Sequence, residues 1–101
     1  MNINIGNYNF YGPFASASGL QNQSGVYAIL GRNGDSEQWK VVDIGESARV
    51  QERVANHDRA SCWNRKGHSR IAAAAYYCAE PQRMNVERVL RSQFDPPCGD
   101  R

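Results

Sequence analysis

The chain lacks the features that identify several common classes of protein. Apolar residues make up only 41% of its 101 residues, and no apolar run approaches the roughly 20 residues needed to cross a bilayer. The N-terminus has neither the basic segment nor the apolar segment that is typical of a signal peptide. The sequence therefore predicts a single domain that is cytoplasmic and has no membrane partner.

Cysteine is also scarce. The chain has three cysteines, Cys62, Cys78 and Cys98, and no C-x-x-C pair. This odd number at wide spacing indicates neither a disulfide framework nor a structural zinc site, so we expect reduced thiols. One alternative is an enzyme that uses Cys62 or Cys78 as nucleophile and His57 or His68 as base. No sequence feature brings such a pair together.

The excess of positive charge is small. A net charge of +2 and a pI near 8.6 do not by themselves identify a nucleic-acid binder. The basic residues are nevertheless concentrated in the middle of the chain, where only Glu52 and Asp58 offset them. They are Arg49, Arg53, Arg59, Arg65, Lys66, His68 and Arg70. Such a run is either a solvated surface or a face that binds phosphates.

The first 23 residues are rich in Asn, Gly, Ser and Gln, with aromatic residues interleaved. We predict an N-terminal arm over residues 1–23 that packs on the domain, with a short edge strand allowed at Ile3–Ile5 and a turn at Gly12-Pro13. An interaction with another protein through these aromatic residues is a further alternative.

The rest of the chain alternates between strand and helix patterns. Strands are predicted at residues 26–30 and 39–44, joined by a loop with the turn signal Asn33-Gly34. A helix then follows over residues 48–57 with Ser47 as its cap, a loop over 59–70 and a strand over 71–79. A last helix runs from Pro81 until Asp95-Pro96-Pro97 stops it. The sequence thus predicts a small α+β domain over residues 24–101, with a three-stranded central antiparallel sheet flanked by helices in the order β-β-α-β-α.

Two half-motifs and three polar residues occur in a fixed order along these elements. They are Gly25-Val26-Tyr27, Asp43-Ile44-Gly45, Arg53, His57 and Glu87. The chain resembles the GIY-YIG nuclease family in this set, over roughly Ser24 to Gly99. It departs from the family at two places, because Asp43 stands where the family has its second tyrosine and Gly99 where the family usually has an asparagine.

The resemblance implies a metal-dependent endonuclease that hydrolyses DNA phosphodiester bonds. Tyr27 would then help to activate the attacking water, and Glu87 would bind Mg²⁺ or Mn²⁺. Arg53 and His57, predicted one turn apart on one helix, would contact the phosphate. Asp43 would complete the catalytic set as a base or second metal ligand, or it would repel the phosphate and leave a domain that does not cut.

A nucleic-acid interface is expected beside these residues, with DNA favoured over RNA. Its predicted members are Ser47, Arg49, Arg59, Trp63, Arg65, Lys66 and His68. A chain this short has no separate targeting domain, so specific cutting would require a homo-oligomer, a larger assembly or a structured substrate. The main alternative is a catalytically inactive module of the same fold that binds nucleic acid or protein, which Asp43 and Gly99 favour.

Overall fold

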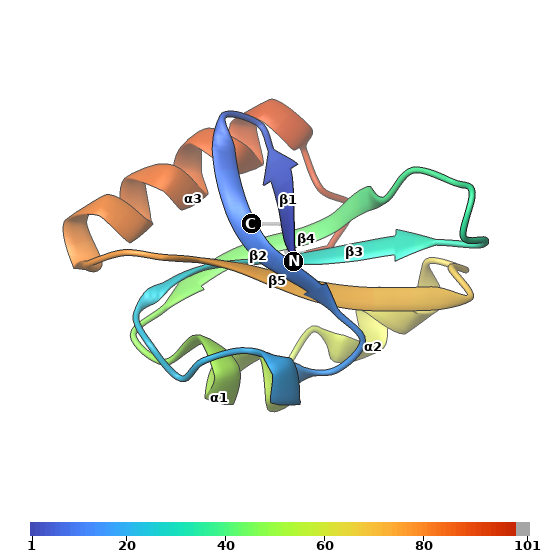
Figure 1. The fold of residues 1–101 in the computed structure, drawn as a ribbon, viewed down its shortest axis with the longest axis horizontal. Helices are drawn as coiled ribbons and strands as arrows, with labels where there is room; N and C mark the ends of the chain where they lie inside the picture. The colour runs from blue at the N-terminus through green and yellow to red at the C-terminus, as the bar shows by residue number, and fades with distance from the viewer. Residues whose placement is uncertain (99–101) are drawn as a thin grey trace.

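The computed structural model describes residues 1–98 and contains an open five-stranded antiparallel sheet with strand order β1-β2-β5-β3-β4 (Figure 1). In chain order the elements are β1 (Asn2–Ile5), β2 (Tyr8–Phe14), the 3₁₀ turn η1 (Ala17–Gly19), β3 (Gly25–Arg32), β4 (Lys40–Ser47), α1 (Val50–Ala55), α2 (Ala60–Arg65), β5 (Arg70–Tyr77) and α3 (Glu80–Phe94). None of the helices within this described part has the length and apolar character needed to cross a membrane.

Strand β3 lies at the centre of the packing. Helix α3 covers one face of the sheet, and α1, α2 and η1 lie against the other (Figure 1). Because both faces are covered, β3 is apolar along most of its length, and its residues point alternately into two cores. Tyr27 and Ile29 pack toward α1 and α2, whereas Val26, Ala28 and Leu30 pack toward α3.

The prediction of a three-stranded sheet is wrong, because residues 1–23 supply two further strands. Strands β1 and β2 form a hairpin, and β2 then pairs with β5 through Tyr11 opposite Ala75 and Phe14 opposite Ala73. The Asn-rich sequence has little intrinsic strand preference, but Phe10 becomes fully buried in the core under α3. Tertiary packing therefore outweighs local propensity here. Gly12-Pro13, expected in a turn, lies inside β2, where the register shifts.

The middle of the chain also differs from the prediction. Helix α1 spans only Val50–Ala55, so His57 follows the helix instead of sharing its face with Arg53. Ser47 belongs to β4, and its hydroxyl accepts a hydrogen bond from the Arg49 N–H at 3.0 Å. The expected loop over residues 59–70 contains α2, which Trp63 anchors in the core.

The end of the described chain returns along the edge of β4. Helix α3 ends at Phe94, Asp95 adopts a left-handed conformation with φ 47°, and the Cys98 N–H donates to the Val42 carbonyl at 3.0 Å. Gly99, where the family resemblance implies an asparagine, lies outside the described residues.

The expectation of three reduced cysteines is also wrong. Cys98 forms a disulfide with Cys62 of α2, with a Cα–Cα distance of 6.0 Å, and Cys78 alone is a free thiol among residues 1–98. Spacing could not predict this pair, because 36 positions separate the two cysteines in the sequence. Only the return of the chain along β4 brings them together.

Candidate functional site

Tyr27 of the first half-motif lies against Gly45 of the second. Tyr27 on β3 pairs with Gly45 on β4, and a Cβ atom at position 45 would lie 2.1 Å from the Tyr27 hydroxyl oxygen. Only glycine therefore leaves room for this hydroxyl. Tyr27 is 1% exposed, so its ring is part of the core and its hydroxyl lies under the β4 backbone.

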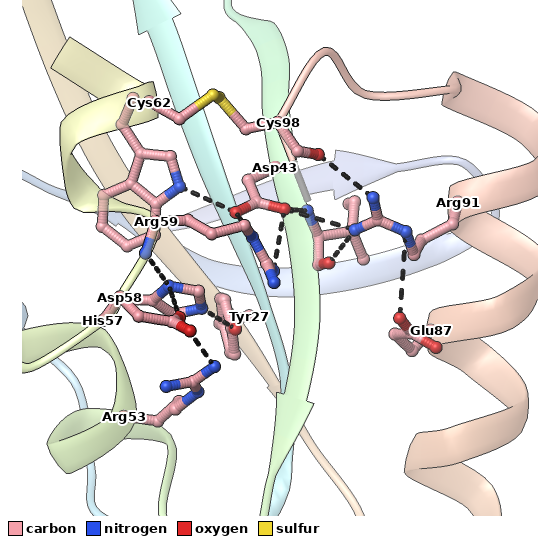
Figure 2. A network of polar contacts seen from close by, with 12 residues as sticks. Tyr27, Asp43, Arg53, His57, Asp58, Arg59, Cys62, Glu87, Arg91 and Cys98 are labelled. Carbon is pink, nitrogen blue, oxygen red and sulfur yellow. Dashed lines mark hydrogen bonds and ion pairs between the residues drawn. A yellow bond between two sulfur atoms is a disulfide. The ribbon is translucent and has the colours of Figure 1, made fainter. Parts of the chain in front are cut away.

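His57 is the hydrogen-bond partner of Tyr27. Its Nε2 contacts the Tyr27 hydroxyl, and its Nδ1 accepts the backbone N–H of Arg59 at 3.0 Å (Figure 2). Because Nδ1 must keep its lone pair to accept this bond, neutral His57 carries its hydrogen on Nε2. His57 therefore donates to the Tyr27 oxygen and leaves the Tyr27 hydrogen available to another acceptor.

The protein environment keeps both groups of this pair uncharged. Burial, together with the positive charges of Arg53 and Arg59, lowers the pKa of His57 to about 4. Burial raises the pKa of Tyr27 to about 12, although the charges of Arg59 and Arg53 act in the opposite direction. At neutral pH the pair is a neutral imidazole and a neutral phenol.

Arg53 lies at the surface next to this pair. Its Nη2 is 3.2 Å from Oδ1 of Asp58, whose side chain is 76% exposed. The same Asp58 oxygen is 3.3 Å from Nδ1 of His57. An exposed ion pair of this kind contributes at most about 1 kcal/mol, so a phosphate can replace Asp58 as the partner of Arg53 at little cost. Arg53 also lines an open pocket of about 470 Å³ with Ser47 and Arg49.

Asp43, at the position of the family's second tyrosine, is completely buried. Its carboxylate accepts hydrogen bonds from Arg59 Nε at 2.9 Å, Trp63 Nε1 at 2.7 Å and Arg91 Nη1 at 3.2 Å (Figure 2). Burial opposes ionisation, but the hydrogen bonds of Arg59 and Trp63 outweigh it and keep the pKa of Asp43 below its ordinary value. With its oxygens held in this way, Asp43 is not placed to contact a phosphate or a metal ion.

Glu87 lies at the other end of the same network. Arg91, one turn later on α3, has its Nε 4.0 Å from Oε2 of Glu87, and it also donates to the carbonyls of Ile44 and Cys98. Glu87 lines an open pocket of about 460 Å³ together with Glu46. Glu46 directly follows Gly45 on β4, and because successive strand residues point to opposite faces, this pocket lies on the α3 face of the sheet, whereas Tyr27 faces α1 and α2.

The donor set fits a weakly held magnesium or manganese ion. Within residues 1–98 no group of three His, Cys, Asp or Glu side chains could enclose a metal ion. Mg²⁺, however, commonly uses one or two carboxylates and takes its other ligands from water and substrate phosphates. Glu87, whose side chain is 27% exposed, supplies one such carboxylate. Glu46 is less suited, because Arg83 Nε binds its Oε1 at 2.6 Å.

The predicted nucleic-acid contacts separate into two groups. Arg49, Arg65 and Lys66 are exposed, and Ser47 is partly exposed. In contrast, Trp63 is buried with its indole N–H on Asp43, so it is not placed to stack on a base. Arg59 bonds Asp43 and the His68 ring packs over Gly31, so both side chains are engaged within the protein and only partly exposed.

Two members of the site were not predicted as functional residues. Asp58 appeared only as an offset to the surrounding positive charge, and Arg91 was not assigned to the site. The signal for Arg91 was its place on α3 next to Leu90, on the stripe that faces the sheet, where a buried arginine requires an acceptor. Arg91 is 7% exposed.

No protein-family model, curated protein or solved structure matches this chain. The GIY-YIG resemblance therefore depends on the residues of the signature alone.

Proposed function

We propose that this domain is a metal-dependent endonuclease that hydrolyses DNA phosphodiester bonds. The observation that carries the proposal is the hydrogen-bonded pair of Tyr27 and His57, which lies between the Arg53 guanidinium and the strand position next to the Glu87 pocket. A nucleophile-activating group, a phosphate-binding cation and a carboxylate for a metal are the parts that such a hydrolase requires.

The two pockets beside Tyr27 offer a path for a phosphate backbone. One contains Arg49 and Arg53, and the other contains Glu87. Glu46 lines the Glu87 pocket and Ser47 lines the Arg53 pocket; these consecutive residues of the edge strand β4 point to opposite faces of the sheet. A strand of DNA lying across the edge of the sheet at this end of β4 would present one phosphate to Arg53, and its neighbouring backbone would lie toward the metal ion held by Glu87.

Tyr27 would act through its hydroxyl oxygen. The Tyr27 hydroxyl would first release its proton to solvent, and His57, which donates its Nε2 hydrogen to the same oxygen, would stabilise the phenolate left behind. That phenolate would then take a proton from the attacking water and return to the phenol. Arg53 and Arg59 add positive charge that favours the same phenolate. Before this step the Arg53–Asp58 pair must open, because Tyr27 is only 1% exposed.

Arg53 would hold the scissile phosphate and would exchange Asp58 for it. Glu87 would hold Mg²⁺ or Mn²⁺. Such an ion, when bound, neutralises charge on the phosphate and stabilises the leaving oxygen. Arg91 keeps the Glu87 carboxylate oriented.

The test is cleavage of labelled single-stranded, duplex, flap and branched DNAs, and of matched RNAs, in the presence of Mg²⁺ or Mn²⁺. We expect the wild type to cut DNA, Glu87→Gln to abolish cutting, and Glu80→Gln on the same helix to cut as the wild type does. Cutting that persists in Glu87→Gln would contradict the role of Glu87.

A second candidate is a module of the same fold that binds nucleic acid without cutting it. The burial of Tyr27 and its pKa of about 12 favour this candidate, since both keep Tyr27 a neutral phenol, which cannot take a proton from water. Salt-sensitive binding with no cleavage under either metal would support it. Both candidate functions are compatible with assembly into a homo-oligomer or a larger complex. A cytoplasmic location stays a proposal, and the Cys62–Cys98 disulfide weakens it.

A further inference from the structure

Asp43 connects the two halves of the candidate site. It bonds Arg59, which precedes α2, and Arg91, which lies on α3 on the other face of the sheet (Figure 2). A buried carboxylate is tolerated only when its charge and its lone pairs are satisfied. Here two guanidinium groups, the Trp63 indole and the N–H of Ile44 at 2.8 Å all point at it.

The charges along this connection alternate in sign. Positive Arg59, negative Asp43, positive Arg91 and negative Glu87 follow one another, with ion-pair distances of 2.9, 3.2 and 4.0 Å. Arg59 and Arg91 thus share the single carboxylate of Asp43. This shared ion pair weakens the attraction of each arginine to other negative groups, such as that of Arg91 to Glu87. Without the charge of Asp43, the attraction of Arg91 to the nearby Glu87 carboxylate would be stronger.

Arg59 connects Asp43 to His57. Its side chain holds Asp43, while its backbone N–H donates to Nδ1 of His57. That backbone bond is what fixes the hydrogen of His57 on Nε2, toward Tyr27. Loss of the Asp43 contact would release the start of α2, and the tautomer of His57 would no longer be specified.

We infer that Asp43 is a positioning residue that replaces a signature tyrosine with an ionic connection, setting the His57–Tyr27 pair through Arg59 and the Glu87 carboxylate through Arg91. The Glu87 half of this inference rests on the proposed function, whereas the His57 half does not. Asp43 itself touches neither substrate nor metal.

The test compares Asp43→Asn with Phe10→Leu, a change in the fully buried core on β2 that lowers stability without a contact to the network. The readouts are Mn²⁺ affinity by electron paramagnetic resonance, kcat and KM for DNA, and the imidazole ¹⁵N spectrum of His57, all well below the unfolding temperature. We expect Asp43→Asn to weaken Mn²⁺ binding about 10- to 100-fold, to lower kcat more than it raises KM, and to mix the His57 tautomers. Phe10→Leu should change none of these.

If Asp43→Asn does not fold, Arg59→Lys and Arg91→Lys separate the two halves. Arg59→Lys should alter the His57 spectrum alone, and Arg91→Lys should alter Mn²⁺ affinity alone. Asp43→Asn that is merely less stable, with affinity, kcat and tautomer unchanged, would overturn the inference, as would single-arginine variants that change neither readout. If the wild type neither binds Mn²⁺ nor cuts, the proposed function fails, and the His57 spectrum still decides whether Asp43 positions that pair.

Discussion

Introducing a tyrosine at position 43 should damage the protein rather than improve it. In Asp43→Tyr a larger phenol must enter a position with no exposed surface, and Arg91, which is 7% exposed, loses its buried carboxylate partner. Overpacking costs about 1–3 kcal/mol, and a buried charge left without its partner costs about 3–5 kcal/mol. Arg59 adds less, because its side chain is 31% exposed and can turn to water. The sum, about 4–8 kcal/mol, is comparable to the whole stability of a small domain.

Urea unfolding followed by circular dichroism measures this loss. With a slope of about 1–2 kcal/mol per molar urea, the midpoint should fall by at least about 2 M, or the variant should be unfolded without urea. Asp58→Tyr is the matched control, because the Asp58 side chain is 76% exposed and the same new residue there should lower stability by at most about 1 kcal/mol, the value of the exposed ion pair with Arg53. A folded Asp43→Tyr protein with the wild-type midpoint, and above all one that cuts DNA faster, would refute the reasoning.

Three further outcomes are expected. The pKa of His57 is 6.5 in the unfolded chain and about 4 in the folded protein, so the unfolded state binds more protons between these two pH values. The free energy of unfolding should therefore decline as the pH falls from about 6.5 to about 4. His57→Gln should remove this dependence on pH in acid titrations. Reducing the Cys62–Cys98 disulfide, which joins residues 36 positions apart, should lower stability by about 3–4 kcal/mol in urea titrations, and an unchanged midpoint would contradict this loop-closure argument. Gly45→Ala should cost about 1–3 kcal/mol because of its 2.1 Å clash, whereas Gly34→Ala, with nothing within 4 Å, should be nearly neutral; equal effects would contradict the close packing over Tyr27.

The elements predicted correctly are those whose local pattern and tertiary role agree. Val26–Leu30 is a continuous apolar run because β3 is covered on both faces, and the helix before Asp95-Pro96 has both an apolar stripe and a clear stop. The sequence allows β1 as a short edge strand at Ile3–Ile5, whereas β2 was missed because its formation depends on pairing with β5, more than 60 positions away in the case of Tyr11 and Ala75. Helix α2 was missed because it has only 6 residues and a single buried anchor, Trp63, so it shows no apolar periodicity.

The predicted site residues lie on the expected elements only where the local pattern defines the element. Tyr27 lies on β3 and Arg53 on α1, and Arg53 lines the pocket that contains Ser47; their roles stay predictions. The pairing of Asp43 with Arg91 could not be predicted, because it joins β4 to α3 across the edge of the sheet and over 48 positions. The tautomer of His57 likewise depends on a backbone N–H in the link between α1 and α2, which no side-chain pattern records.

The measurement that tests the central claim most directly is DNA cleavage by Tyr27→Phe compared with the wild type and with Tyr76→Phe. Phenylalanine keeps the buried ring of Tyr27 and removes only the hydroxyl that His57 contacts. The account predicts that the wild type cuts in Mg²⁺ or Mn²⁺, that Tyr27→Phe lowers kcat at least about 100-fold without unfolding, and that Tyr76→Phe cuts normally. A wild type that does not cut, or a Tyr27→Phe variant that cuts at the wild-type rate, would contradict it.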